Sequence, residues 1–149
     1  EILVITKNRS NSAFNQIGEF DLYLVNYKVP QQPFSYGQNN GILQALTDKH
    51  RDDDLLINAA TAAKKMISDN DRICIQTSSG KTATCRARIT ELVHPEVVAC
   101  QGHGGRFARA LKNSRKGINY NDLLAFDEDH VDFVSAAVDS CVKVKIWKL

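Results

Sequence analysis

The residues best suited to bind a ligand lie in the run RKGINYNDLL, Arg115 to Leu124, where a glycine precedes two asparagines. Asn119 and Asn121 each carry a donor and an acceptor on one short amide, which suits the polar edge of a heterocyclic ring. Asparagine also tolerates left-handed backbone and bonds to its own main chain, so the same pair is typical of a turn. The motif alone is compatible with both roles.

Two further segments share this polar character. Arginine binds phosphate with a fork of donors, and glycine lets backbone N–H groups approach it. The segment CQGHGGRFARALKNSRK places His103 between glycines and Arg106 at the head of a basic stripe that ends at Lys116. The loop NYKVPQQPFSYGQNNG offers Lys28, Ser35, Gln38, Asn39 and Asn40. Together these groups suit a ligand with phosphates and hydrogen-bonding rings, although the stripe alone could be a solvated basic face.

Nothing in the sequence favours catalysis by this chain alone. No serine lies in a G-x-S-x-G frame, and the histidine spacing favours no catalytic triad. The cysteines form no C-x-x-C pair, so no zinc or iron–sulfur site is indicated. Most lie in apolar or alternating runs, where cysteine is usually a small buried hydrophobe. We expect four reduced structural thiols, at Cys74, Cys85, Cys100 and Cys141.

Three successive carboxylates, Asp52 to Asp54, form the one acidic cluster that could bind a divalent cation. Contiguous acids in one turn point in different directions, which weakens a metal site. We therefore expect a solvated turn here.

Length and charge describe one globular domain over residues 1–149. The hydrophobic content is 43% and the net charge is +2, too small to imply a nucleic-acid partner by itself. No apolar run reaches the length of a membrane span, so we expect no membrane insertion. The chain begins at Glu1, without a methionine or a signal peptide, which is what we expect of a piece excised from a larger catalytic subunit.

The elements that must position these residues are short strands. A period of two in apolar residues predicts a β-strand. Gly80 marks a hairpin turn between two of them, and an alanine-rich run at 59–66 predicts a helix. Residues 42–46 indicate the start of a short helix or a turn. The predicted strands lie at residues 1–7, 20–30, 55–58, 71–77, 82–90, 94–100 and 141–149. Because the strands do not alternate with helices, we expect a closed β-barrel with helical insertions.

The order of these segments resembles a known family. The run from INAATAAKKM through RICIQT, SSGK and HPEVVAC to QGHGG, followed by GINYNDLL, is similar to the C-terminal molybdopterin-dinucleotide-binding domain of the dimethyl-sulfoxide-reductase family of molybdenum and tungsten oxidoreductases. The upstream YLVNYKVPQQPFSYGQNNG resembles the first loop of that domain. Two positions depart from the family pattern: Asn70 replaces a turn glycine, and Tyr120 separates the two asparagines.

This resemblance implies a mainly β fold with short helices, a double-psi β-barrel, that covers molybdopterin guanine dinucleotide. The molybdenum or tungsten would be held by the remaining domains of the parent oxidoreductase, with an iron–sulfur electron-transfer subunit as a further partner. By matching positions, the loop with Lys28, Ser35, Gln38, Asn39 and Asn40 would meet the pyrophosphate or pterin. The glycine turn with His103, and the pair Asn119 and Asn121, would contact the pterin side, with Asn121 the strongest candidate.

The loop YKVP followed by NNG resembles that of sulfur-compound or polysulfide-type reductases more than that of formate or nitrate enzymes, and this resemblance implies a sulfur compound as substrate. The alternative function is a non-catalytic barrel that binds protein or nucleic acid through the stripe from Arg106 to Lys116. That alternative predicts affinity with a steep salt dependence and no need for a pterin.

Overall fold

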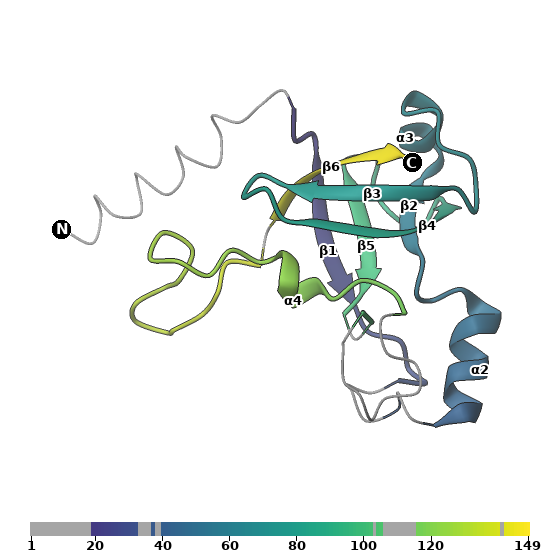
Figure 1. Cartoon of the computed structure of the whole chain (residues 1–149), viewed down its shortest axis with the longest axis horizontal. Helices are drawn as coiled ribbons and strands as arrows, with labels where there is room; N and C mark the ends of the chain where they lie inside the picture. Colours follow the sequence, from purple (N-terminus) through teal and green to yellow (C-terminus); the bar gives the residue numbers. More distant parts are fainter. Residues whose placement is uncertain (1–18, 33–36, 38–39, 103, 106–115, 141) are drawn as a thin grey trace.

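The computed structural model describes residues 19–32, 37, 40–102, 104–105, 116–140 and 142–149. Six strands in this part of the chain close into a barrel in the order β1–β5–β2–β4–β3–β6 (Figure 1). The strands are β1 (Leu22–Tyr27), β2 (Leu55–Asn58), β3 (Arg72–Thr77), β4 (Thr82–Thr90), β5 (Val97–Gln101) and β6 (Val142–Lys148). The strand expected at 1–7 lies outside the described residues.

The barrel has an internal two-fold relation in its connectivity. Strand β1 runs parallel to β5, and β2 runs parallel to β4, whereas the other four pairings are antiparallel. Exchanging β1–β3 with β4–β6 maps each pairing onto a pairing of the same sense. Two interlocked parallel pairs of this kind make the double-psi β-barrel that the sequence resemblance implies, and closure leaves the sheet without edges.

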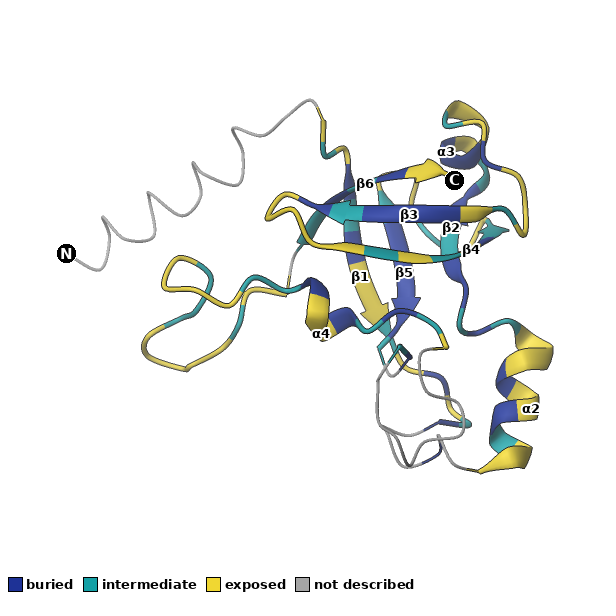
Figure 2. Ribbon diagram, in the orientation of Figure 1, coloured by how far each residue is buried: buried dark blue, intermediate teal, exposed yellow. Residues whose placement is uncertain are grey.

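The barrel interior is apolar and follows the predicted alternation. Ile73, Ile75 and Thr77 on β3 are fully buried, and Ile146 and Val144 on the paired strand β6 lie beside Ile75 and Thr77 in register. Figure 2 shows the buried residues concentrated on the strands and the exposed residues on the connecting turns. Lys143, Lys145 and Trp147 alternate with these buried residues and lie on the outer face of β6. Lys145 contacts the Trp147 ring there, 5.9 Å from its centroid.

In the described residues three short helices flank the barrel, and local caps determine where they begin and end. Helix α2 (Gly41–His50) begins because the side chain of Asn40 accepts hydrogen bonds from the amides of Ile42 and Leu43. It ends at Arg51, whose left-handed backbone (φ 55°) turns the chain. Helix α3 (Ala59–Lys64) is capped by Asn58, and α4 (Tyr120–Leu123) is a single turn.

The described cysteines are free thiols, as expected. Burial raises the pKa of Cys85 and of Cys100 to about 12, so both stay protonated and act as small apolar groups. Cys141 lies outside the described residues. None of the described helices is long and apolar enough to cross a membrane.

Candidate functional site

The site is built where the parallel strands β1 and β5 end together. Tyr27, the last residue of β1, is in register with Gln101, the last residue of β5. The amide of Gly102 continues this pairing by donating to the Tyr27 carbonyl at 3.0 Å. Both arrowheads point to one end of the barrel, and α2 lies at that end (Figure 1). The glycine turn after β5 therefore starts from a fixed position.

The glycine turn packs directly against the G-I-N-Y-N motif. A Cβ on Gly104 would lie 3.1 Å from the carbonyl oxygen of Lys116 and 3.2 Å from the Cα of Gly117. A Cβ on Gly105 would lie 2.6 Å from the carbonyl carbon of Ile118, and closer still to the amide nitrogen of Asn119. The amide of Gly105 also donates to the Lys116 carbonyl. Two segments that the sequence nominated separately thus form one surface, and only glycine permits their approach.

The side chains of the two asparagines of the motif do not form the hydrogen bonds that close the local turn. Asn119 occupies the N-cap position of α4, yet its side chain makes no capping hydrogen bond. Asn121 is exposed, and its contribution to the turn is its backbone carbonyl, which accepts from Leu124 at 3.3 Å. The turn itself depends on Gly117, whose φ of +74° favours glycine. Both amides therefore remain available to a ligand, and their roles as contacts stay predictions.

Tyr120, between the asparagines, fixes this turn to the barrel. The ring is 2% exposed, and its hydroxyl donates to the carbonyl of Ser140, just before β6. Leu123 on the next turn is also buried. Tyr120 therefore has a structural role that anchors the motif, which the sequence left undetermined.

The acidic run Asp52 to Asp54 forms a turn, but it is not solvated. Asp52 and Asp54 are buried, and burial raises the pKa of Asp52 and of Asp53. The carboxylate of Asp53 lies against the motif, since a Cβ on Gly117 would be 3.0 Å from its Oδ1 atom. The expected solvated turn is wrong because non-local partners, described next, cover these acids. In the described residues no group of three or more potential ligands could hold a metal ion.

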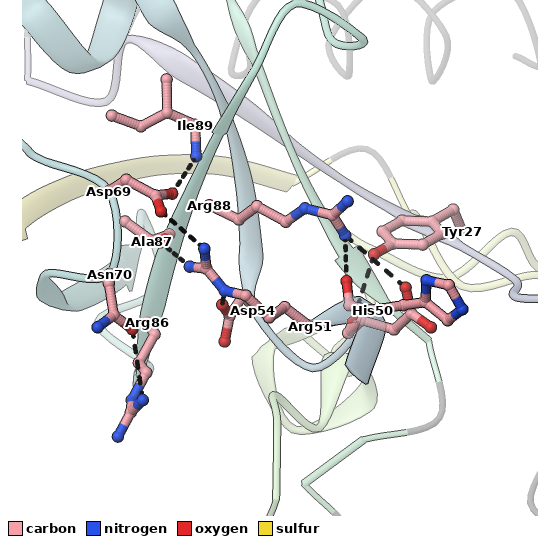
Figure 3. Close-up of polar contacts among 11 residues, drawn as sticks. Tyr27, His50, Arg51, Asp54, Asp69, Asn70, Arg86, Ala87, Arg88 and Ile89 are labelled. Atoms are coloured by element: carbon pink, nitrogen blue, oxygen red, sulfur yellow. Dashed lines mark hydrogen bonds and ion pairs between the residues drawn. The ribbon is translucent and has the colours of Figure 1, made fainter. Parts of the chain in front are cut away.

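Two arginines hold this acidic turn in place (Figure 3). Arg51 donates to Asp54 and Asp69, each at 2.7 Å, and to the carbonyl of Ala87 at 2.8 Å. It thereby ties the end of α2 to strand β4. This clamp joins segments that are 36 residues apart in the sequence.

The second arginine, Arg88, connects the turn to the end of β1. It donates to the carbonyl of His50 at 2.6 Å and lies 3.8 Å from the Asp52 carboxylate. The hydroxyl of Tyr27 donates to the Asp52 carbonyl at 3.3 Å (Figure 3). Burial raises the pKa of Tyr27 to about 12, so this hydroxyl stays protonated. The network positions the end of β1.

The structure describes only some of the other residues that the sequence nominated. Lys28 is exposed directly after β1, and Asn40 uses its side-chain oxygen to cap α2, as described above. Lys116, at the end of the basic stripe, pairs with Asp48 at 3.0 Å. Other nominated residues lie outside the described part of the chain: Ser35, Gln38, Asn39, His103 and Arg106.

Gln101 is a further candidate for the site that the sequence did not nominate. Its side chain is 3% exposed, and its Nε2 atom meets no hydrogen-bond acceptor in the described part of the chain. The signal was present in the sequence, because a glutamine directly follows the apolar run VVAC and precedes the glycines. It was overlooked because position 101 resembles the end of a strand more than the start of a loop.

Comparison with known proteins places this geometry in a family. The family model described as "Molydopterin dinucleotide binding domain" matches residues 22–136. A curated relative, the arsenate respiratory reductase molybdopterin-containing subunit ArrA of Chrysiogenes arsenatis, is 32% identical over 109 residues, which is 68% of this chain and 13% of that protein.

A solved structure shows the same fold. Acetylene hydratase from Pelobacter acetylenicus superposes with a TM-score of 0.65 and 15% identity over 87% of this chain and 18% of that one. The chain thus spans a small fraction of either protein. No finding supports a barrel that binds nucleic acid or protein through the basic stripe. The match over residues 22–136 shows that this chain belongs to the molybdopterin dinucleotide binding domain family.

Proposed function

We propose that this chain forms one wall of the site for molybdopterin guanine dinucleotide in a larger molybdenum or tungsten oxidoreductase. The observation that supports it best is the packing of Gly104 and Gly105 against residues 116–119 at the carboxyl ends of β1 and β5. Ligands of barrels and α/β sheets often lie at such strand ends, where loops converge on a rigid scaffold.

The residues present fit a dinucleotide. Gly102, Gly104 and Gly105 carry no side chains, so a pyrophosphate could approach the backbone of this turn closely. Asn119 and Asn121 offer amides that can pair with the polar edge of a pterin. Gln101 holds a buried donor without an acceptor in the described residues. The glycine turn, the two asparagines and Gln101 would bind and orient the dinucleotide. None of these roles requires the chain to transfer a proton.

When bound, the cofactor supplies two-electron redox chemistry at its metal, which we assign to other domains. The role of this chain is to hold the dinucleotide in one orientation and to exclude water from one side of it. The partly buried network of Arg51, Arg88 and Asp52 holds the strand ends in position for that purpose.

For the substrate, we propose an inorganic sulfur compound or a related oxoanion, reduced with electrons from an iron–sulfur partner subunit. Two likenesses support this class. The loop YKVP…NNG resembles that of sulfur-compound reductases, and the curated relative is described as an arsenate respiratory reductase. A panel of polysulfide, thiosulfate, arsenate, nitrate and formate, offered to the full-length protein, tests it. Turnover of only nitrate or formate would contradict the proposal.

The cofactor proposal is tested through Asn121. In the full-length native protein, Asn121→Ala should lower the bound guanine nucleotide and metal, measured after acid release, because an exposed amide aimed at the pterin is lost. Asn70→Gly is the matched control: it removes an exposed amide from a turn with φ 69°, which glycine adopts without strain. Equal cofactor content in both variants and the wild type would contradict the role of Asn121.

A further inference from the structure

The carboxamide of Gln101 has no structural explanation in the described residues. Its Nε2 atom is sealed from water and has no acceptor there. Buried polar groups are hydrogen-bonded in more than about 90% of cases, because leaving one unpaired forfeits its hydration without compensation. An orphaned donor at this position therefore requires an acceptor from somewhere else.

Other buried glutamines in the described part of the chain do have partners. Gln32, as buried as Gln101, donates its Nε2 to the Thr47 hydroxyl at 2.7 Å. Gln44 donates to Asp48 at 3.0 Å. The fold therefore satisfies buried carboxamides where they are purely structural, and Gln101 differs from them.

The position of Gln101 indicates which acceptor is missing. It ends β5 next to Tyr27, and the chain continues into Gly102, where an added Cβ would lie 3.5 Å from the side chain of Asn26. Three residues after Gln101, Gly104 meets the backbone of the G-I-N-Y-N motif. Gln101 therefore leads directly into the turn that packs against this motif.

We propose that the Gln101 carboxamide donates a hydrogen bond to an acceptor oxygen of the bound dinucleotide. This inference rests on the proposed function, since it needs the cofactor at this end of the barrel. A neutral amide suits the position because it can bind an oxygen without placing a charge in the cofactor-free barrel. Gln101 then retains the cofactor and takes no part in the reaction at the metal.

The test is Gln101→Met in the full-length native protein, because methionine keeps the length and removes both polar atoms. The proposal predicts opposite effects on the two forms of the protein. The cofactor-free protein, produced in a host that cannot make the pterin, should keep or raise its Tm, since an unpaired buried donor is gone. The loaded protein should release guanine nucleotide about tenfold faster, as expected for one lost hydrogen bond.

Two control variants separate this role from a structural one. Gln32→Met breaks a paired buried amide and should lower the Tm of the cofactor-free protein, because the Thr47 hydroxyl loses its partner. Gln76→Met changes a half-buried amide on β3, a strand that does not pair with β5, and should leave nucleotide release at the wild-type rate.

The outcomes distinguish this inference from the proposed function. A wild-type protein without pterin and nucleotide would refute both. A loaded wild type with unchanged release from Gln101→Met would refute only the role of Gln101. A Tm loss in cofactor-free Gln101→Met equal to that of Gln32→Met would show a protein acceptor and overturn the inference. If Gln101→Met is insoluble, Gln101→Glu, which keeps the shape and removes the donor, decides by the same release rate.

Discussion

At the scale of single residues, glycines and amides shape the site. The sequence identified the glycine turn and the paired asparagines, because both patterns depend on residue type alone. It could not show that Gly105 lies against Ile118 and Asn119, since this contact is created by the barrel. Nor could it show that Gln101 lacks an acceptor, which depends on every neighbour in the folded chain.

The contact at Gly105 can be measured against a matched glycine. Gly105→Ala should destabilise the 149-residue chain by about 3 kcal/mol or more, because the new methyl group meets backbone that cannot move freely. Gly80 also has positive φ, but a Cβ there meets nothing within 4 Å. Gly80→Ala should therefore cost only the backbone strain, about 1–2 kcal/mol. Equal losses in urea unfolding would show that the two turns do not pack as described.

The free energy of unfolding should depend on pH through the half-buried carboxylate of Asp53. Because burial raises the pKa of Asp53 above its ordinary value of 3.8, the folded chain binds this proton more tightly than the unfolded chain. This contribution to the free energy of unfolding is fully present below pH 3.8 and is lost as the pH rises through the raised pKa.

Asp53→Asn removes the titration and keeps the shape. The free energy of unfolding of the variant, relative to the wild type, should therefore increase as the pH is raised from about 4 to 7. Asp69, whose pKa is lowered by its hydrogen bond from Arg51, contributes with the opposite sign, but it is present in both proteins and cancels in the difference. A difference that stays constant with pH in denaturant titrations would contradict the burial of Asp53.

At the scale of elements, alternation and caps determined most of the fold. Strands β3, β4 and β6 follow strict period-two patterns, so their inward faces were predictable. Helix α2 is longer than the five residues expected, because its ends depend on the Asn40 cap and the left-handed Arg51. The acidic turn was misjudged for a related reason: it packs against β4, through Arg88 and the Ala87 carbonyl, and no local pattern reveals this contact.

The Arg51 clamp gives a testable element-level prediction. Arg51→Ala should lower the free energy of unfolding by about 1–3 kcal/mol, because a partly buried guanidinium bonded to Asp54, Asp69 and the Ala87 carbonyl is lost. Arg86→Ala is the control, on strand β4, which Arg51 contacts at Ala87. The Arg86 side chain is exposed and makes one 3.3 Å contact to Asn70. It should change stability by no more than about 0.5 kcal/mol. Similar values for both would mean that the clamp does not hold the turn.

At the scale of the whole molecule, the described chain is a closed barrel, and the proposed binding surface lies at one end of it. The resemblance anticipated the double-psi arrangement, and the two-fold relation between β1–β3 and β4–β6 agrees with it. Periodicity alone predicted closure without the strand order, because parallel pairing joins segments far apart in the chain. The family match and the small share of its relatives that this chain spans are consistent with one wall of a larger site.

The most direct test of that claim is a structure of the full-length native protein with its cofactor, determined by cryo-electron microscopy. The account predicts density for a pterin dinucleotide against the carboxyl ends of β1 and β5, in contact with the glycine turn and the Asn119–Asn121 motif. Density on another face of the barrel, or a fully loaded protein whose cofactor does not touch these segments, would contradict it.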